Sequence, residues 1–188
     1  METQASDGAR RDSRRYQLAL RLMAHHARTG TISAMTSLSR HQQEALRQRW
    51  GVAEDTRRRG PSPSSLSRFT HSPRARSEGA VLASFCHIYG LLPLGSLAGV
   101  SRRRLLTLEF GECLCDTYES YRGCFPWSRF EIEELLSFAL AIAANRVIGV
   151  GRCESCSGTV IMDRLAPRRP SCAHCQRAPV ASWTADGE

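Results

Sequence analysis

Two pairs of cysteines constrain this chain of 188 residues more than any other feature. The segment GRCESCSGTVIMDRLAPRRPSCAHCQ, residues 151–176, holds Cys153 and Cys156 in one CxxC turn and Cys172 and Cys175 in another. Fifteen residues separate the two turns. Two CxxC pairs at this spacing are typical of a zinc site. The alternatives are an iron–sulfur cluster or a redox pair, but nothing nearby suggests a path to a redox cofactor.

The expected zinc site, one per chain, is structural, because four protein ligands leave no open position for a substrate. Gly158 would let the chain pass close to the metal. Residues 147–180 have few apolar side chains, so folding energy must come from thiolate–zinc bonds, which contribute about 10–16 kcal/mol in zinc-finger peptides. His174 lies inside the second turn and is expected to be exposed or to support a ligand, because four cysteines leave it no vacancy.

Four other cysteines lie earlier in the chain. Cys86 falls near an apolar helical face and is expected to be a core thiol. Cys113 and Cys115 form a CxC pair that could join a second metal with Cys124. No run of eighteen apolar residues is present, and the N-terminal sequence lacks the apolar stretch of a secretory signal. We therefore expect a cytoplasmic location, where thiols stay reduced.

The charge of the chain is concentrated at one end. The formal net charge is +8, and all 26 basic residues are Arg. Residues 1–76 carry 15 Arg against 6 acidic residues, residues 77–146 carry 6 against 8, and residues 147–188 carry 5 against 4. A GC-rich genome explains the missing Lys but not this distribution. A localised basic block favours a polyanion partner, most simply nucleic acid.

The apolar periodicity predicts a mainly α-helical fold with short strands in a C-terminal four-cysteine zinc-binding segment. The expected divisions are a flexible N-terminus (1–12), N-terminal helices with a helix-turn-helix-like segment (13–55), an Arg/Ser/Pro-rich linker or arm (56–78), a helical core (79–146), the zinc-binding segment (147–180) and a tail (181–188).

Three helical stretches are predicted outside the helix-turn-helix. The first starts near Tyr16 and ends at Gly30, with Tyr16, Leu20, Met23, Ala24 and Ala27 on one apolar face. Others cover residues 79–92, and 100–121 with an interruption at Gly111.

A fourth helix is expected to start at Ser128, with Glu131 completing a capping box. Its buried face would hold Ile132, Leu135, Leu136, Ala139, Leu140 and Ala143. The early glutamates Glu133 and Glu134 complement the helix dipole rather than acting as catalytic carboxylates.

Residues 31–51 resemble a helix-turn-helix. Ser39 and Gln42 form a capping box for the second helix, Leu46 and Trp50 mark its buried face, and Gly51 ends it. Arginine pairs with guanine and glutamine with adenine in the major groove, so the residues expected to face outward are DNA-contact candidates. An ordinary helical hairpin with a solvated basic face is the alternative. The candidates on this helix are Arg40, Gln43, Arg47 and Arg49.

Two loops supply further candidate contacts to phosphate. Arg57, Arg58 and Arg59 could lie along a phosphate backbone, although a solvated linker is the competing interpretation. Around the cysteines, positive charge either stabilises the thiolates or contacts phosphate. These residues are Arg152, Arg164, Arg168, Arg169 and Arg177.

The order of these features resembles the FlhC family, the flagellar transcriptional activator subunits of proteobacteria. The resemblance covers about residues 15–178. Four stretches carry it: LSRHQQEALRQRWG (38–51), GPSPSSLSRF (60–69), VLASFCHIYGLL (81–92), and NRVIGVGRCESCSGTVI (145–161) with CAHC (172–175). The stretch GECLCDTYESYRGCFPW (111–127) and the short tail depart from the family pattern, which is consistent with a divergent paralogue that has other target genes.

The resemblance implies a partner and a role. FlhC subunits act in a hetero-oligomer, a hexamer, with FlhD, bind upstream of flagellar promoters and recruit RNA polymerase. It also implies zinc on the four cysteines of the two CxxC turns. The alternative is a zinc-stabilised scaffold subunit without direct DNA contact. An enzyme is not expected, because the sequence offers no nucleophile–base pair, phosphate loop or open metal triad.

Overall fold

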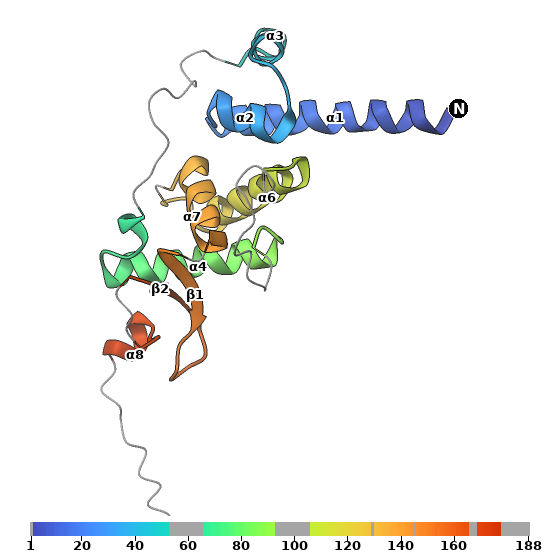
Figure 1. The fold of residues 1–188 in the computed structure, drawn as a ribbon. Coiled ribbons are helices and arrows are strands. Elements are labelled where there is room, and N and C mark those ends of the chain that lie inside the picture. The colour runs from blue at the N-terminus through green and yellow to red at the C-terminus, as the bar shows by residue number, and fades with distance from the viewer. Residues whose placement is uncertain are drawn as a thin grey trace, which may run out of the picture.

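The computed structural model describes residues 2–52, 66–92, 106–128, 130–144, 146–165 and 169–177, with side chains described in these ranges from Gly8 to Gln176. These residues form a mainly helical body with a two-stranded antiparallel sheet and a cluster of four cysteines, as the sequence predicts. Figure 1 shows α1, α2 and α3 at one end, α6 and α7 in the middle, and α4, the sheet and α8 towards the other end. No helix in these ranges is both long and apolar enough to cross a membrane.

The first helix, α1 (Glu2–Ala24), is longer than expected. The predicted flexible terminus at 1–12 belongs to this helix from Glu2 onward. Its buried side chains include Leu18, Leu22 and Met23, which pack into the core. The chain turns at His26, which has a φ of +59°. The prediction that Gly30 ends the first helix is therefore wrong, because Gly30 lies inside α2 (Thr29–Thr36).

The predicted turn between α2 and α3 (Arg40–Trp50) is confirmed. Ser37 ends α2 in the left-handed region with a φ of +58°. The Ser39 hydroxyl accepts from the Gln42 backbone N–H, and the Gln42 side chain accepts from the Ser39 N–H, which completes the capping box. Gly51, with a φ of +63°, ends α3. This local chemistry sets both helix ends without help from the core.

Part of the expected linker belongs to the body. Residues 67–69 form the short 3-10 helix η2 (Ser67–Phe69), and α4 (Pro73–Ile88) begins six residues before Gly79. Ser72 caps α4 through the Ala75 N–H. Phe69 is buried, with its ring centroid 4.5 Å from that of Phe138. This aromatic contact fixes η2 to the core.

The middle helix, α6 (Leu108–Cys124), passes through Gly111 without interruption. A Cβ on Gly111 would lie 2.6 Å from Leu18 Cδ2 and 3.1 Å from Met35 Sδ. The glycine therefore allows α6 to approach α1 and α2 closely, and it is not a helix breaker here.

The helix α7 (Ile132–Ala144) begins later than predicted. The Glu131 N–H donates to Glu134 Oε2, so Glu134 supplies the contact that Ser128 and Glu131 were expected to make. Ser128 instead accepts from the Phe130 N–H in the preceding turn. The predicted inward face is confirmed for Ile132, Leu135, Leu136, Ala139 and Ala143, and it also holds Phe138.

The C-terminal segment contains β1 (Ile148–Arg152) and β2 (Thr159–Asp163). They pair antiparallel, with Val150 opposite Ile161 and Arg152 opposite Thr159. β2 packs on α4 and β1 on α7, and the short helix α8 (Ala173–Arg177) follows. The hairpin therefore connects the helical core directly to the first cysteine turn.

Candidate metal centre and basic surfaces

The four predicted cysteine ligands come together in space. The Sγ atoms of Cys153, Cys156, Cys172 and Cys175 all lie within 4.8 Å of one another. Cys156 Sγ and Cys172 Sγ are 3.7 Å apart. A tetrahedral ion with metal–sulfur bonds of about 2.3 Å needs sulfur–sulfur distances of about 3.8 Å. The four thiols are therefore placed to hold one metal ion.

Backbone N–H groups prepare Cys153 for this role. The Cys172 N–H donates to Cys153 Sγ at an N···S distance of 3.3 Å. Together with the N–H groups of Cys156 and Ser155, it lowers the pKa of the Cys153 thiol to about 6. The Cys175 N–H, at 3.3 Å from Cys172 Sγ, likewise lowers the pKa of Cys172. Donors aimed at sulfur favour the thiolate, which is the metal-binding form.

The other two thiols retain protons more strongly. Hydrogen bonds with Cys172 and Cys156 raise the pKa of Cys175 to about 12. The Gly158 N–H lowers the pKa of Cys156, but shared hydrogen bonds with Cys153 and Cys172 raise it overall. Neighbouring thiols cannot all ionise without a compensating positive charge. A bound cation supplies that charge, so binding would release protons from this cluster.

Strand pairing and turn geometry place the ligands. The Cys153 N–H donates to the Gly158 carbonyl at 2.8 Å, closing the first turn directly after β1. Ser157 has a φ of +59°, so it takes the left-handed conformation within this turn. A Cβ on Gly158 would lie 3.3 Å from Cys156 Sγ, which supports the prediction of a close approach. The Glu154 N–H donates to the Pro170 carbonyl and joins the two CxxC segments.

The remaining cysteines are in different surroundings. Cys86 is buried as predicted, and burial raises the pKa of its thiol to about 12. Cys113 and Cys115 lie on α6 two residues apart, so their side chains diverge rather than share a metal with Cys124. Among the residues described, only the Cys153 cluster groups at least three metal-ligating side chains this closely. His174 is exposed, as expected.

Two of the four predicted DNA contacts on α3 point inward. Gln43 and Arg47 are only 2% and 3% exposed, so the prediction that they face solvent is wrong. Gln43 Nε2 donates to Ser33 Oγ at 2.7 Å and to the Leu38 carbonyl at 3.1 Å. Tertiary hydrogen bonds to α2 and its turn determine which face is buried, and they override the apolar pattern of the isolated helix.

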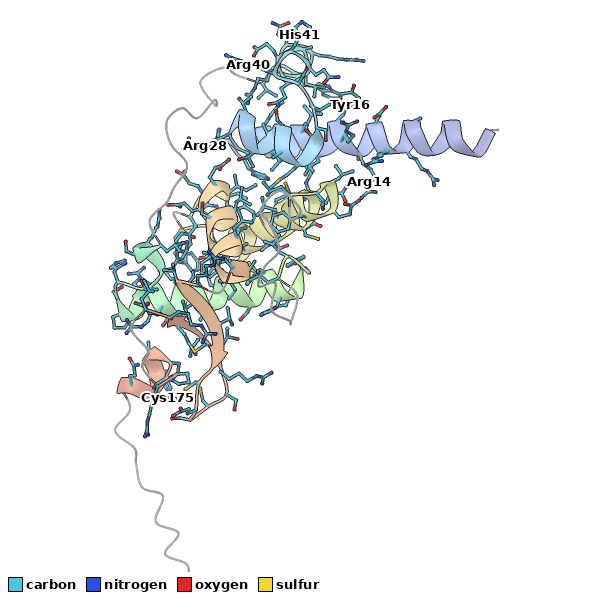
Figure 2. The ribbon with its side chains drawn as sticks, in the orientation of Figure 1. Arg14, Tyr16, Arg28, Arg40, His41 and Cys175 are labelled. Carbon is cyan, nitrogen blue, oxygen red and sulfur yellow. The ribbon has the colours of Figure 1, made fainter. Side chains whose placement is uncertain are left out.

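The predicted apolar face of α3 is buried only in part. Trp50 is 62% exposed, which is opposite to the expectation, whereas Leu46 is half-buried and packs against the core. Arg40 and Arg49 are exposed and remain available. Figure 2 shows Arg40 and His41 at the end of the molecule opposite Cys175. The cations of α3 and of the metal centre therefore belong to two separate surfaces.

Part of the basic N-terminal block is paired with acidic side chains of the same chain. Arg14 and Arg21 of α1 pair with carboxylates of α6, including Glu112 at 2.6 Å and Glu119 at 2.7 Å. These acids raise the pKa of both guanidiniums. The positive charge of residues 1–76 therefore joins helices as well as presenting a surface, a role that composition alone did not distinguish.

A cleft of about 300 Å³ lies between α4, β2 and α8, and it is bordered by the exposed Arg169 and the half-buried Arg76. Arg76 of α4 and Arg169 of the second CxxC segment both line it, together with His71, Asp163 and Gln176. Arg76 was missed by sequence reasoning because it was assigned to the linker. Its position just after the Ser72–Pro73 helix start was the available signal.

The other predicted arginines have mixed outcomes. Arg152 and Arg164 are exposed beside the hairpin. The predicted contacts at Arg57, Arg58, Arg59 and Arg168 lie outside the described residues.

Comparison with known proteins leaves the family open. No protein-family model matches the chain, and no curated protein matches it. The resemblance to FlhC therefore rests on the sequence motifs quoted above.

Proposed function

We propose that the chain is a zinc-stabilised, non-enzymatic DNA-binding subunit of a transcriptional activator. It acts with an FlhD-type partner at flagellar or related promoters and helps to recruit RNA polymerase. The observation that carries this proposal is the closed four-thiol cluster, which fixes a loop bearing exposed arginines.

Zinc is the proposed occupant of the cluster. Four thiolates at tetrahedral spacing suit Zn²⁺, and with four protein ligands the ion has no open position for catalysis. The cluster connects β1, the loop around Pro170 and α8, three elements with little apolar surface of their own. The zinc ion would therefore act as the local core that holds this end of the molecule in shape.

The end of the molecule that contains the metal centre is the proposed DNA-contact surface. Arg152 and Arg169 are exposed and make no ion pair with any described residue, and Arg76 shares the cleft with Arg169. Guanidinium groups bind phosphate through a planar fork of donors. A rigid loop that carries several of them would position the subunit on the DNA backbone. Base reading is not assigned to any of these residues.

The second candidate is a scaffold subunit that contacts only proteins. The exposed Trp50 of α3 favours it, since exposed apolar surface marks protein contacts. The two candidates differ in one property. If the metal end binds DNA, the affinity for DNA falls as the salt concentration rises, and the slope of log K against log salt is proportional to the number of phosphate contacts. A scaffold that contacts only proteins has no such DNA affinity.

Two double variants with equal loss of charge test the location of the DNA contact. Arg152→Gln with Arg169→Gln removes two cations from the metal end, and Arg10→Gln with Arg40→Gln removes two exposed cations from the opposite end. The zinc-loaded protein would be titrated with a labelled promoter fragment at several salt concentrations. We expect the first pair to reduce the slope of log K against log salt by about 1.8, and the control pair to change it little. A reduced slope only in the control pair would place the contact at the α3 end.

A further inference from the structure

The exposed apolar side chains of α1 and α3 form one groove. It has a volume of about 540 Å³ and lies between residues 13–20 of α1 and 42–50 of α3. Tyr16, Leu20, Leu46 and Trp50 supply its apolar surface. Tyr16 and Leu20 belong to the apolar face that the sequence predicts for this helix, and Tyr16 is 39% exposed. The helices are thus packed so that an apolar groove between them is open to solvent.

The contacts that hold α3 to the rest of the molecule explain why this groove is left open. The buried contacts of α3 with the helical core include the amide of Gln43 and the side chain of Arg47, whereas Leu46 is only half-buried and Trp50 is exposed. Burying a tryptophan or leucine side chain stabilises a protein by about 1.5–3 kcal/mol, whereas burying polar groups costs free energy unless they are hydrogen-bonded. An arrangement with polar groups inside and apolar groups outside is unfavourable for the free chain and favourable once the groove is covered.

The charge around the groove indicates what covers it. Arg49 lines the groove, no acidic side chain does, and Arg49 makes no ion pair with any described residue. Arg10 is exposed on α1, seven residues before Gln17, and therefore lies on the same helix face as that lining residue. Arg14 and Arg21 of α1 are paired with carboxylates of α6, so Arg49 and Arg10 supply the positive charge on this side of the helices. An acidic occupant would complement this surface.

The length of the groove sets the form of the occupant. Residues 13–20 of α1 cover about two helical turns, or about 12 Å. An amphipathic helix that lies in such a groove presents anchors at positions i, i+3 or i+4, and i+7, which span the same length.

We infer that the α1–α3 groove is a docking site for an amphipathic helix of a partner protein. The helix has an apolar stripe over two to three turns and at least one carboxylate that reaches Arg49. The inference deepens the proposed function by placing the partner, and it rests on that proposal for the existence of one. It leaves the metal end free to contact DNA, because α3 and the metal centre lie at opposite ends of the molecule (Figures 1 and 2).

A peptide selection that contains no DNA tests the inference. A displayed library of 14-residue helix-forming peptides would be selected on the zinc-loaded full-length chain, and the affinities of the recovered peptides would be measured by fluorescence polarisation. We expect peptides with the i, i+3 or i+4, i+7 apolar pattern and an acidic flank. Trp50→Ser should weaken their binding at least about tenfold. The matched control is Trp127→Ser, because Trp127 is 70% exposed elsewhere on the surface, and it should change affinity less than twofold.

A charge reversal tests the acidic flank separately. Arg49→Glu should weaken peptides with an acidic flank about tenfold and favour peptides in which lysine replaces the acid. Recovered peptides whose binding does not depend on Trp50, or the absence of any binder, would overturn the inference.

Two other occupants would also overturn it. If sedimentation shows a dimer that Trp50→Ser dissociates, a second copy of the chain covers the groove. If removal of residues 178–188 tightens peptide binding through the groove, the chain's own terminus covers it. Because no DNA is present, failure here leaves the DNA-contact proposal intact, and loss of DNA binding leaves the groove intact.

Discussion

Gln43 of α3 donates through its side-chain amide to the hydroxyl of Ser33 in α2 at 2.7 Å. The same nitrogen also reaches the carbonyls of Leu38 and Thr29, at 3.1 and 3.3 Å. A residue expected to read bases is thus a polar attachment point for the whole helix. With Gln43 buried, Trp50 is left exposed and Leu46 only half-buried, and so this amide helps to determine the surface that α3 offers to a partner.

Removing this amide should loosen α3. We expect Gln43→Met to lower the free energy of unfolding by about 1–3 kcal/mol, because it leaves buried acceptors without their donor. Urea unfolding followed by circular dichroism measures the change. Gln48→Met is the control, since Gln48 is exposed on the same helix and should stay within about 0.5 kcal/mol of the parent protein. Equal effects of the two substitutions would contradict the role of Gln43.

The contact of α6 with α1 and α2 depends on a missing Cβ. Gly111→Ala would place that atom 2.6 Å from Leu18 Cδ2 in a buried contact. We expect a destabilisation of about 1–3 kcal/mol from overpacking, measured by thermal or urea unfolding.

Gly123→Ala provides the matched control for Gly111→Ala on the same helix. A Cβ on Gly123 would have nothing within 4 Å. Alanine should therefore stabilise α6 there by about 0.5–1 kcal/mol. If both substitutions were stabilising, the close approach at Gly111 would be wrong.

The four thiols should act as one metal site. Cys153→Ser should remove one metal ligand. Loss of a residue that only hydrogen-bonds to a ligand lowers metal affinity by roughly 10–100-fold, so loss of the ligand itself should lower zinc affinity by more than this. Zinc content after dialysis and the proteolytic resistance of residues 147–177 would both fall. Cys124→Ser changes an exposed cysteine of α6 and should alter neither measurement. Full zinc content in the Cys153 variant would contradict the four-ligand assignment.

The core thiols should make the protein sensitive to alkali. Burial raises the pKa of Cys86 to about 12 from an ordinary value of 9.0. Below pH 9 the folded and unfolded states both hold this proton, so the stabilising contribution is fully present. Above pH 9 the unfolded state loses the proton first, and stability falls by about 1.4 kcal/mol per pH unit until about pH 12.

A variant isolates this contribution. Cys86→Ala should show a shallower loss of stability between pH 9 and pH 10.5 than the parent protein, whatever its stability at pH 7.5. Cys115, whose pKa burial also raises to about 12, should maintain part of the slope. An unchanged slope in the Cys86 variant would show that this thiol is not shielded from solvent.

Local signals in the sequence were sufficient for some elements. Ser39 and Gln42 are three residues apart, and their capping box needs only the backbone between them. The cysteine turns are similar, because the CxxC spacing itself places two sulfurs on one side of a turn. These features could be predicted from the sequence, since few distant residues are needed to form them.

Other features depend on contacts that span the chain. The face of α3 that is buried is decided by Ser33 and the Leu38 carbonyl, not by the apolar residues of the helix. Gly111 lies inside α6 because the close approach of Leu18 leaves no room for a Cβ there, and this contact comes from a distant part of the chain. The start of α4 was hidden because Ser72 and Pro73, a cap and a first-turn residue, occur in an Arg/Ser/Pro-rich run that resembles a linker.

The most direct test of the central claim is a salt-titrated DNA-binding assay on the zinc-loaded chain. It would be run on the chain alone and with an FlhD-type partner, using a flagellar promoter fragment and a scrambled fragment. We predict sequence-specific binding with the partner, a negative slope of log K against log salt, and a slope reduced by about 1.8 in the Arg152→Gln, Arg169→Gln variant. No salt-dependent binding in either form would contradict a DNA-binding subunit and favour the scaffold.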